Sequence, residues 1–264
     1  MINCKAIILA GGQGKRLRPL TNNNPKCMVK IFDRSILEHQ INCFRECGIN
    51  DITVVTGYRS EKIKFKNINY VKNKNYKKTN MVYGLFLAKE KLNGIVIISY
   101  GDIVYEKKIL KRLVREKNDI SITVDRNWKK LWELRFDNPL SDAESLRLDK
   151  NGFITDIGRK VEKIEDIQGQ YIGLMKFQNA GLELLKSWYE KFGLESRSKN
   201  NVLNSKLSFE SSFMTDLLQT LIKQGCKLKS VTISGGWLEI DTLKDYKLYH
   251  KLSLEGKISQ FFKI

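Results

Sequence analysis

The feature that most constrains the fold is a short apolar run near the start of the chain, which ends in a glycine-rich segment. Residues 6–10, AIILA, are continuously apolar, as in a strand buried on both faces of a sheet. Gly11, Gly12 and Gly14 follow, and a loop with so few side chains exposes backbone N–H groups that bind anions. The segment therefore predicts an α/β fold with an anion site at the end of its first strand.

Strand and helix patterns alternate along the first half of the chain. The helix at 35–47 is the clearest, because Ser35 and Glu38 form a capping-box pattern and Gly48 follows its end. Further helices are predicted at 80–92 and 107–116, and strands at 52–56, 94–99 and 120–125. Such alternation predicts a parallel or mostly parallel sheet with helices on both faces.

The pattern changes after residue 125. Segments 145–149 and 153–157 flank Lys-Asn-Gly, which predicts a hairpin. We expect later strands at 170–177, 228–233 and 237–240, helices at 181–192 and 213–223, and a polar loop at 197–208. No internal repeat or flexible linker interrupts the 264 residues, so one domain with an elaborated second half is expected.

Charge and hydropathy narrow the range of partners. The net charge of +18 would suit nucleic acid, but the basic residues are spread along the chain without interleaved aromatic residues. We therefore expect no nucleic-acid partner and assign part of the charge to phosphate binding. No apolar stretch approaches the ~20 residues of a membrane span, and the first residues lack a signal-peptide pattern. A cytoplasmic protein without a membrane partner is expected.

Five cysteines, an odd number, predict free thiols. His39, Cys43 and Cys47 recur at helical spacing and could suggest a metal site. Burial of this helix face in the core is the favoured interpretation, because cysteine is often buried and no fourth ligand is evident.

Spacing excludes two familiar phosphate-binding loops. A dinucleotide fingerprint needs a third glycine at the position of Leu17, and Pro19 would break the helix that it opens. This argues against an oxidoreductase of that class. A GxxxxGK[ST] loop needs glycine in place of Leu9 and Ser or Thr in place of Arg16. The anion is therefore held in another way.

The ordered pattern L-A-G-G-x-G-x-R-L-x-P-L-T, followed by P-K-x-M-V, spans Leu9 to Val29 and closely resembles the nucleotidyltransferase superfamily. The resemblance implies a Rossmann-like mixed, mostly parallel sheet between helices, with a small acceptor-binding β/α elaboration. It implies one domain over residues 1–264, with a nucleotide-binding half at 1–125 and an acceptor-binding half with C-terminal helices at 126–264. The glycine loop would wrap the triphosphate of an NTP.

The resemblance also implies roles for particular residues. Arg16 and Lys26 would neutralise phosphates and act in catalysis. Asp102 and Asp241 each follow a predicted strand, where open α/β sheets bind ligands, and by resemblance they form the Mg²⁺ pair; a non-catalytic relative would lack it. The predicted nucleotide-binding residues are Leu9, Ala10, Gly11, Gly12, Gly14, Lys15, Arg16, Lys26, Thr79, Asn80, Tyr100 and Asp102.

The acceptor site is predicted from the second half of the chain. By resemblance, Lys160 holds the acceptor phosphate and is the third catalytic residue. Aromatic side chains suit a cationic amine, a carboxylate suits an ammonium group and an arginine suits a carboxylate. Core packing remains the alternative for the tryptophans. The predicted acceptor-binding residues are Trp128, Trp132, Arg135, Glu144, Lys160, Tyr171 and Glu239.

Segments across nearly the whole chain, including 98–105, 125–132, 138–144 and 213–216, resemble CTP-dependent cytidylyltransferases of small phosphorylated acceptors. This branch includes enzymes for phosphoglutamine, phosphocholine and 2-aminoethylphosphonate, and phosphoglutamine enzymes match most segments. The resemblance implies Mg²⁺-dependent transfer from CTP to L-glutamine phosphate, with pyrophosphate release, for capsule or surface polysaccharide modification. The alternative is a sugar-1-phosphate nucleotidylyltransferase that uses UTP, dTTP or CTP. The sequence leaves open the acceptor and whether the protein forms a homodimer.

Overall fold

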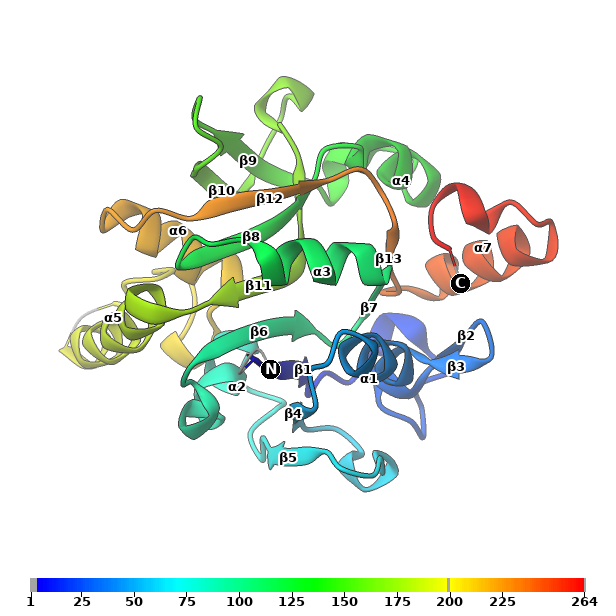
Figure 1. Cartoon of the computed structure of the whole chain (residues 1–264), viewed down its shortest axis with the longest axis horizontal. Coiled ribbons are helices and arrows are strands. Elements are labelled where there is room, and N and C mark those ends of the chain that lie inside the picture. Colours follow the sequence, from blue (N-terminus) through cyan, green and yellow to red (C-terminus); the bar gives the residue numbers. More distant parts are fainter. Residues whose placement is uncertain (1–3, 199, 264) are drawn as a thin grey trace.

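A seven-stranded sheet forms the centre of the molecule, in the order β12-β8-β11-β6-β1-β4-β5 (Figure 1). The computed structural model describes residues 4–198 and 200–263. The strands of this sheet are β1 (Cys4–Ala10), β4 (Asp51–Thr56), β5 (Asn69–Lys72), β6 (Ile95–Tyr100), β8 (Ile120–Asp125), β11 (Gln170–Phe177) and β12 (Lys229–Ile233). Only β11 runs antiparallel to its neighbours, so the predicted mixed, mostly parallel sheet is confirmed.

Helices cover both faces of the sheet. Successive side chains of β1 point to opposite faces, and since nearly all of these side chains are apolar, both faces must be buried. Ala6 and Ile8 lie in one apolar cluster, whereas Ile7 and Leu9 lie in another. The first cluster includes residues of α1 (Ile36–Glu46) and α3 (Lys107–Arg115), which lie in front of the sheet in Figure 1. The second includes residues of α2 (Met81–Leu87), α5 (Asn179–Ser198) and α6 (Met214–Lys223). Among the described residues, no helix has both the length and the apolar character needed to cross a membrane.

Three short ribbons add to the main sheet. The predicted hairpin is present as β9 (Glu144–Leu148) and β10 (Ile154–Lys160), which pair antiparallel. β2 (Lys30–Ile31) pairs with β3 (Arg34–Ser35). β7 (Ile103–Tyr105) pairs with β13 (Trp237–Glu239), which joins two segments that are far apart in the sequence. This last ribbon positions part of the site described below.

Several elements differ from the sequence predictions. The helix expected at 80–92 ends at Leu87 and is followed by a 3-10 turn at Lys89–Lys91. Part of the predicted loop at 197–208 belongs to the last turn of α5, which extends to Ser198. The helix α4 (Trp128–Arg135) was not predicted, and α7 (Leu243–Leu254) is the main C-terminal helix. In α4 the buried face includes Arg135, so a charged residue interrupts the apolar periodicity that would indicate a helix.

Candidate active site

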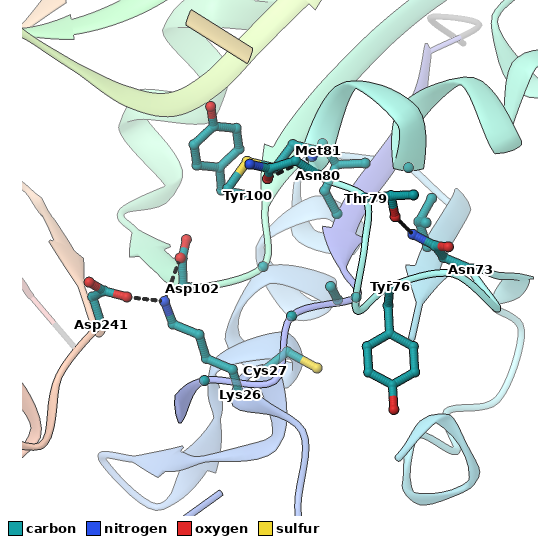
Figure 2. A pocket seen from close by; sticks show the side chains of 18 of the residues that line it. Lys26, Cys27, Asn73, Tyr76, Thr79, Asn80, Met81, Tyr100, Asp102 and Asp241 are labelled. Carbon is teal, nitrogen blue, oxygen red and sulfur yellow. Dashed lines mark hydrogen bonds and ion pairs between the residues drawn. The ribbon is translucent and has the colours of Figure 1, made fainter. Parts of the chain in front are cut away.

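A cavity of about 410 Å³ opens beside the ends of β1 and β6 (Figure 2). Its volume lies in the usual range for small-molecule sites. Every residue predicted to bind the nucleotide lines this cavity, so the structure brings that whole set together. The other lining residues are Cys27, Val55, Asn73, Tyr76, Met81, Gly84, Gly101, Phe213, Glu239 and Asp241.

The backbone of the glycine loop packs closely against its neighbours. Gly14 has a φ of 63°, and a Cβ on this residue would lie 2.9 Å from Cβ of Lys26. Gly101 likewise has no room for a side chain, because an added Cβ would lie 2.7 Å from the carbonyl oxygen of Leu9. The hydroxyl of Thr21 donates to the carbonyl of Gly14 at 2.7 Å and fixes the turn. Glycine at both positions therefore lets the loop approach Lys26 and Asp102.

Lys26 joins the two aspartates that were predicted as a metal pair. Its Nζ lies 2.7 Å from Asp102 Oδ2 and 2.6 Å from Asp241 Oδ1, as the dashed lines in Figure 2 show. Arg16 Nη2 lies 2.6 Å from the other oxygen of Asp241. Burial alone would lower the pKa of the Lys26 ammonium, but the two carboxylates hold the pKa above its ordinary value. Both predicted catalytic cations of the first half thus meet the predicted metal pair.

Backbone pairing explains why the two aspartates converge. Asp102 immediately precedes β7, and Asp241 lies two residues after the end of β13. In the ribbon, Glu239 is the partner of Ile103, and the N–H of Ile240 donates to the carbonyl of Asp102 at 2.9 Å. The two carboxylates are therefore brought together by adjacent ends of paired strands.

The carboxylates fit a magnesium site of the kind that is completed by a substrate. Asp102 Oδ1 is buried and has no hydrogen-bond partner, so it can accept a further cation. No group of three or more His, Cys, Asp or Glu side chains suited to a metal ion occurs in the described parts of the chain. Mg²⁺ is commonly held by one or two carboxylates together with substrate phosphates and water. Asp102 and Asp241 match that donor set.

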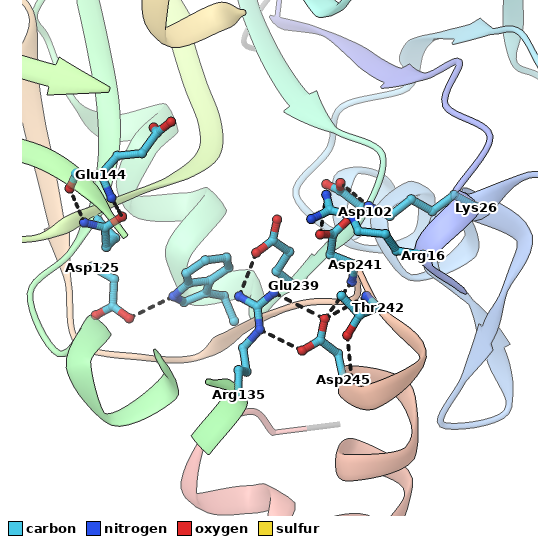
Figure 3. Close-up of polar contacts among 12 residues, drawn as sticks. Arg16, Lys26, Asp102, Asp125, Arg135, Glu144, Glu239, Asp241, Thr242 and Asp245 are labelled. Carbon is cyan, nitrogen blue, oxygen red and sulfur yellow. Dashed lines mark hydrogen bonds and ion pairs between the residues drawn. The ribbon is translucent and has the colours of Figure 1, made fainter. Parts of the chain in front are cut away.

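Arg135 occupies a different environment from the predicted acceptor pocket. Its side chain is 1% exposed and contacts Asp245 through Nε at 2.9 Å and Nη2 at 3.3 Å. Its Nη1 lies 2.7 Å from Glu239 Oε2 (Figure 3). With these donors engaged by two carboxylates, the structure does not present Arg135 as a free partner for an acceptor carboxylate. This corrects the sequence-based placement.

The tryptophans of α4 pack as core residues and do not line the cavity. Trp128 and Trp132 are each 4% exposed, and their rings pack edge to face at 5.9 Å. Trp132 also lies 6.1 Å from Trp237 and beneath the guanidinium of Arg135. The alternative of core packing therefore describes them better than an aromatic wall does, because burial leaves little ring surface for a ligand.

Of the remaining predicted acceptor residues, Glu239 alone lines the cavity. Lys160 and Glu144 are cross-strand partners in the β9–β10 hairpin, and both are exposed. Tyr171 packs edge to face on Tyr100, a cavity residue, with ring centroids 5.5 Å apart. Although the Glu144 side chain is exposed in part, the protein atoms around its carboxyl group, reinforced by nearby carboxylates, raise its pKa to about 7. The hairpin thus places one acid and one base opposite each other, outside the residues that line the cavity.

The histidine and cysteines of α1 do not form a metal centre in the described structure. His39 Nε2 lies 2.8 Å from the carbonyl oxygen of Ile31, and burial lowers the pKa of His39. Cys43 is buried in the core, and burial raises the pKa of its thiol to about 12. These residues therefore have a packing role, and all five cysteines are free.

Several cavity residues were not identified from the sequence. Asn73 and Tyr76 follow β5, an edge strand of only four residues that gives little strand signal. Asn73 Nδ2 donates to Thr79 Oγ1 at 2.9 Å, which links this loop to the predicted Thr79–Asn80 segment (Figure 2). Phe213 is 50% exposed at the start of α6 and reaches the cavity from the second half of the chain. In the sequence, the available signal for Phe213 as a site residue was an aromatic side chain at the start of a predicted helix.

Comparison with known proteins gives consistent matches. The family model described as the MobA-like NTP transferase domain matches residues 6–149. Over 254 residues the chain is 39% identical to the CTP:phosphoglutamine cytidylyltransferase of Campylobacter jejuni, covering 92% of this chain and 98% of that protein. It is 37% identical over 115 residues to the choline-phosphate cytidylyltransferase of Streptococcus pneumoniae, covering 42% of this chain and 50% of that protein.

A solved structure supports the same fold. The CTP:phosphocholine cytidylyltransferase from Streptococcus pneumoniae has a TM-score of 0.72 and 24% sequence identity with this chain. The match covers 94% of this chain and 99% of that one. At this identity the likeness concerns the fold alone, and it extends over both halves of the chain.

Proposed function

This chain belongs to the MobA-like NTP transferase family, and from that premise we propose that it is a cytidylyltransferase for a small phosphorylated acceptor. The acceptor phosphate attacks the α-phosphorus of CTP, the bond to the β-phosphate oxygen breaks, and pyrophosphate leaves. L-Glutamine phosphate is the proposed acceptor. The observation that carries this proposal is the 39% identity to a phosphoglutamine enzyme over 98% of that enzyme's length.

The reaction needs charge neutralisation and alignment more than proton transfer. The phosphoryl group of the acceptor is expected to be largely ionised near neutral pH, as phosphate esters are with their second pKa of about 6, so the nucleophile needs no general base. The main obstacle is to bring two polyanions together in line. Backbone N–H groups of the glycine loop bind the triphosphate, while Arg16 and Lys26 neutralise it. The cavity lined by these residues supports the assignment.

Asp102 and Asp241 would hold the divalent metal that nucleotidyltransferases of this family generally use, and we propose Mg²⁺. When bound, this ion supplies positive charge to the phosphate oxygens of the nucleotide. In the ligand-free protein the Lys26 ammonium contacts both carboxylates, and Arg16 contacts one of them. A triphosphate that enters the cavity offers new anionic partners to both side chains. Lys26 thereby connects the nucleotide to the metal pair.

The acceptor binds, we propose, between this cavity and the β9–β10 hairpin. Lys160 neutralises the acceptor phosphate, and Glu144 attracts an ammonium group of the acceptor. Glu144 and Lys160 lie opposite each other on the hairpin, which supports recognition of both charges of one small molecule. The product, CDP-linked for a phosphate acceptor and CMP-linked for a phosphonate, would serve the modification of a capsule or another surface polysaccharide.

The test is pyrophosphate release from each of the four common NTPs with Mg²⁺. Acceptors would include L-glutamine phosphate, phosphocholine, 2-aminoethylphosphonate and glucose 1-phosphate. We expect turnover with CTP and an amine-bearing acceptor, and a loss of turnover when the metal is removed by EDTA. Exclusive use of UTP or dTTP with the sugar phosphate would contradict the cytidylyl assignment and leave the enzyme class intact.

A further inference from the structure

The network around Arg135 has a feature that acceptor binding does not explain. Arg135 lies in α4, and its guanidinium joins Glu239 of β13 to Asp245 of α7. Asp245 is itself 1% exposed. A buried carboxylate and a buried guanidinium are costly unless each has several partners. Their other contacts therefore indicate what the pair is for.

Asp245 Oδ2 accepts hydrogen bonds from two consecutive backbone N–H groups, Asp241 at 3.1 Å and Thr242 at 2.8 Å. The side chain of Thr242 accepts in return from the N–H of Asp245 at 3.1 Å, which completes a capping box at the start of α7. The backbone of Asp241 is thus attached to the carboxylate of Asp245. Figure 3 shows this connection from Arg135 to the metal pair.

The other carboxylate that Arg135 contacts is also close to the metal pair. Glu239 lines the cavity and precedes Asp241 by two residues. One guanidinium therefore restrains the segment on both sides of Ile240, through the side chain of Glu239 and through the Asp245 cap. The planar fork of arginine suits this bidentate contact, which the single ammonium of lysine does not reproduce.

We propose that Arg135 and Asp245 are positioning residues that fix Asp241 in the orientation that binds the metal–nucleotide complex. The inference rests on the proposed metal pair. Neither residue touches the substrate, and each acts through the backbone or the neighbouring carboxylate of the 239–242 segment. Partners of this kind orient metal ligands, and their loss commonly reduces metal affinity or activity about 10- to 100-fold.

The test measures binding as well as turnover. Mn²⁺ serves as the spectroscopic probe, and its binding is followed by electron paramagnetic resonance with a CTP analogue that has a methylene group between the α- and β-phosphates. For Asp245→Asn and Arg135→Lys we expect Mn²⁺ affinity to fall about 10- to 100-fold. Affinity for the analogue in EDTA should change less than about twofold, because the glycine loop is untouched. The double variant should lose no more than the worse single variant, since the two residues act as one unit.

A matched control separates positioning from stability. Ser35→Ala removes a buried helix cap of α1, where Ser35 Oγ accepts from the N–H of Glu38 at 3.1 Å. This variant should have a lower melting temperature and unchanged Mn²⁺ affinity. If Asp245→Asn behaves in the same way, its role is only to cap α7 and the proposal fails. Should Arg135→Lys instead raise KM for the acceptor and leave Mn²⁺ affinity unchanged, Arg135 binds the acceptor.

The proposed metal pair itself has a separate test. Asp102→Asn should weaken Mn²⁺ binding at least as much as Asp245→Asn does. If wild-type protein and Asp102→Asn bind Mn²⁺ equally, the metal assignment fails, and with it the premise of the positioning proposal. If Asp102→Asn weakens binding and Asp245→Asn and Arg135→Lys do not, only the positioning proposal is overturned.

Discussion

The nucleotide end and the acceptor end of the site are built in different ways. At the nucleotide end, one continuous segment, 9–16, supplies seven of the residues that line the cavity, three of them glycines. At the proposed acceptor end, single side chains come from the β9–β10 hairpin, β11 and β13. Every predicted nucleotide residue lines the cavity, whereas Glu239 is the one predicted acceptor residue that does so in the described structure.

This difference shows which kind of site a sequence reveals. A loop whose backbone binds the ligand requires glycine at fixed spacing, and that requirement is visible in consecutive residues. An acceptor site assembled from separate elements depends on the direction of each side chain. Arg135 illustrates this. Its charge suggested that it binds an acceptor carboxylate, whereas in the structure it is buried and contacts Asp245.

The largest effect is expected at Lys26, which contacts both carboxylates of the proposed metal pair. Lys26→Ala removes the cation shared by Asp102 and Asp241 and leaves their repulsion uncompensated. We expect kcat to fall about 1,000-fold or more in a pyrophosphate-release assay, as for loss of a central electrostatic group. Lys30→Ala, at an exposed lysine of β2, is the control and should retain wild-type kcat. Near-normal turnover of Lys26→Ala would remove Lys26 from the mechanism.

Lys160 tests whether the hairpin belongs to the acceptor end. Lys160→Ala should lower kcat/KM for the acceptor about 10- to 100-fold, as expected for loss of a charge-assisted hydrogen bond. KM for CTP should stay unchanged, and steady-state kinetics with each substrate varied in turn separates the two effects. The exposed Lys163→Ala is the matched control. Equal behaviour of the two variants would exclude the hairpin from acceptor binding.

A substitution at Gly14 tests whether nucleotide binding depends on the backbone conformation of the glycine loop. An alanine there must adopt a φ of 63° and must push against Cβ of Lys26. We expect the free energy of unfolding to fall by about 1–3 kcal/mol, the usual cost of such strain, together with weaker CTP binding. Gly12→Ala is the control for stability, because an added Cβ meets no atom within 4 Å. Equal stability of the two variants in urea denaturation would contradict this account of the loop.

The smallest effect concerns the pH dependence of Glu144, whose pKa is raised from an ordinary 4.5 to about 7. The folded protein holds this proton more tightly than the unfolded chain, so wild-type stability should fall relative to Glu144→Gln as pH rises from about 4.5 to 7. Above pH 7 the carboxylate is charged, and KM for an amine-bearing acceptor should be about two- to fivefold lower in wild type than in Glu144→Gln.

Melting curves and acceptor KM values from pH 5 to 8 test both statements about Glu144. The ionisation of the acceptor phosphate contributes equally to the two proteins and cancels in the comparison. Glu162→Gln, at an exposed position near the hairpin, should follow wild type throughout. An identical KM profile for wild type and Glu144→Gln would exclude Glu144 from acceptor recognition.

For the fold, too, features shown by consecutive residues could be predicted, and features that depend on tertiary contacts could not. The strands at 120–125 and 170–177 have the predicted bounds, because most of their residues are apolar or β-branched and nearly all are buried. β5 was missed because it has only four residues and polar ends, and α4 because Arg135 lies on its buried face. The two aspartates could be identified because both follow buried strands. Their connection through Lys26 depends on tertiary contacts that no local pattern encodes.

The β7–β13 ribbon has a consequence for how such an enzyme can change its substrate. The separation of the two carboxylates depends on a main-chain ladder, whose strands lie about 4.8 Å apart whatever their side chains are. Residues on the β9–β10 hairpin can therefore be exchanged without altering the spacing on which phosphorus chemistry depends. An attempt to redesign the acceptor preference should vary that hairpin and leave residues 102–105 and 237–245 unchanged.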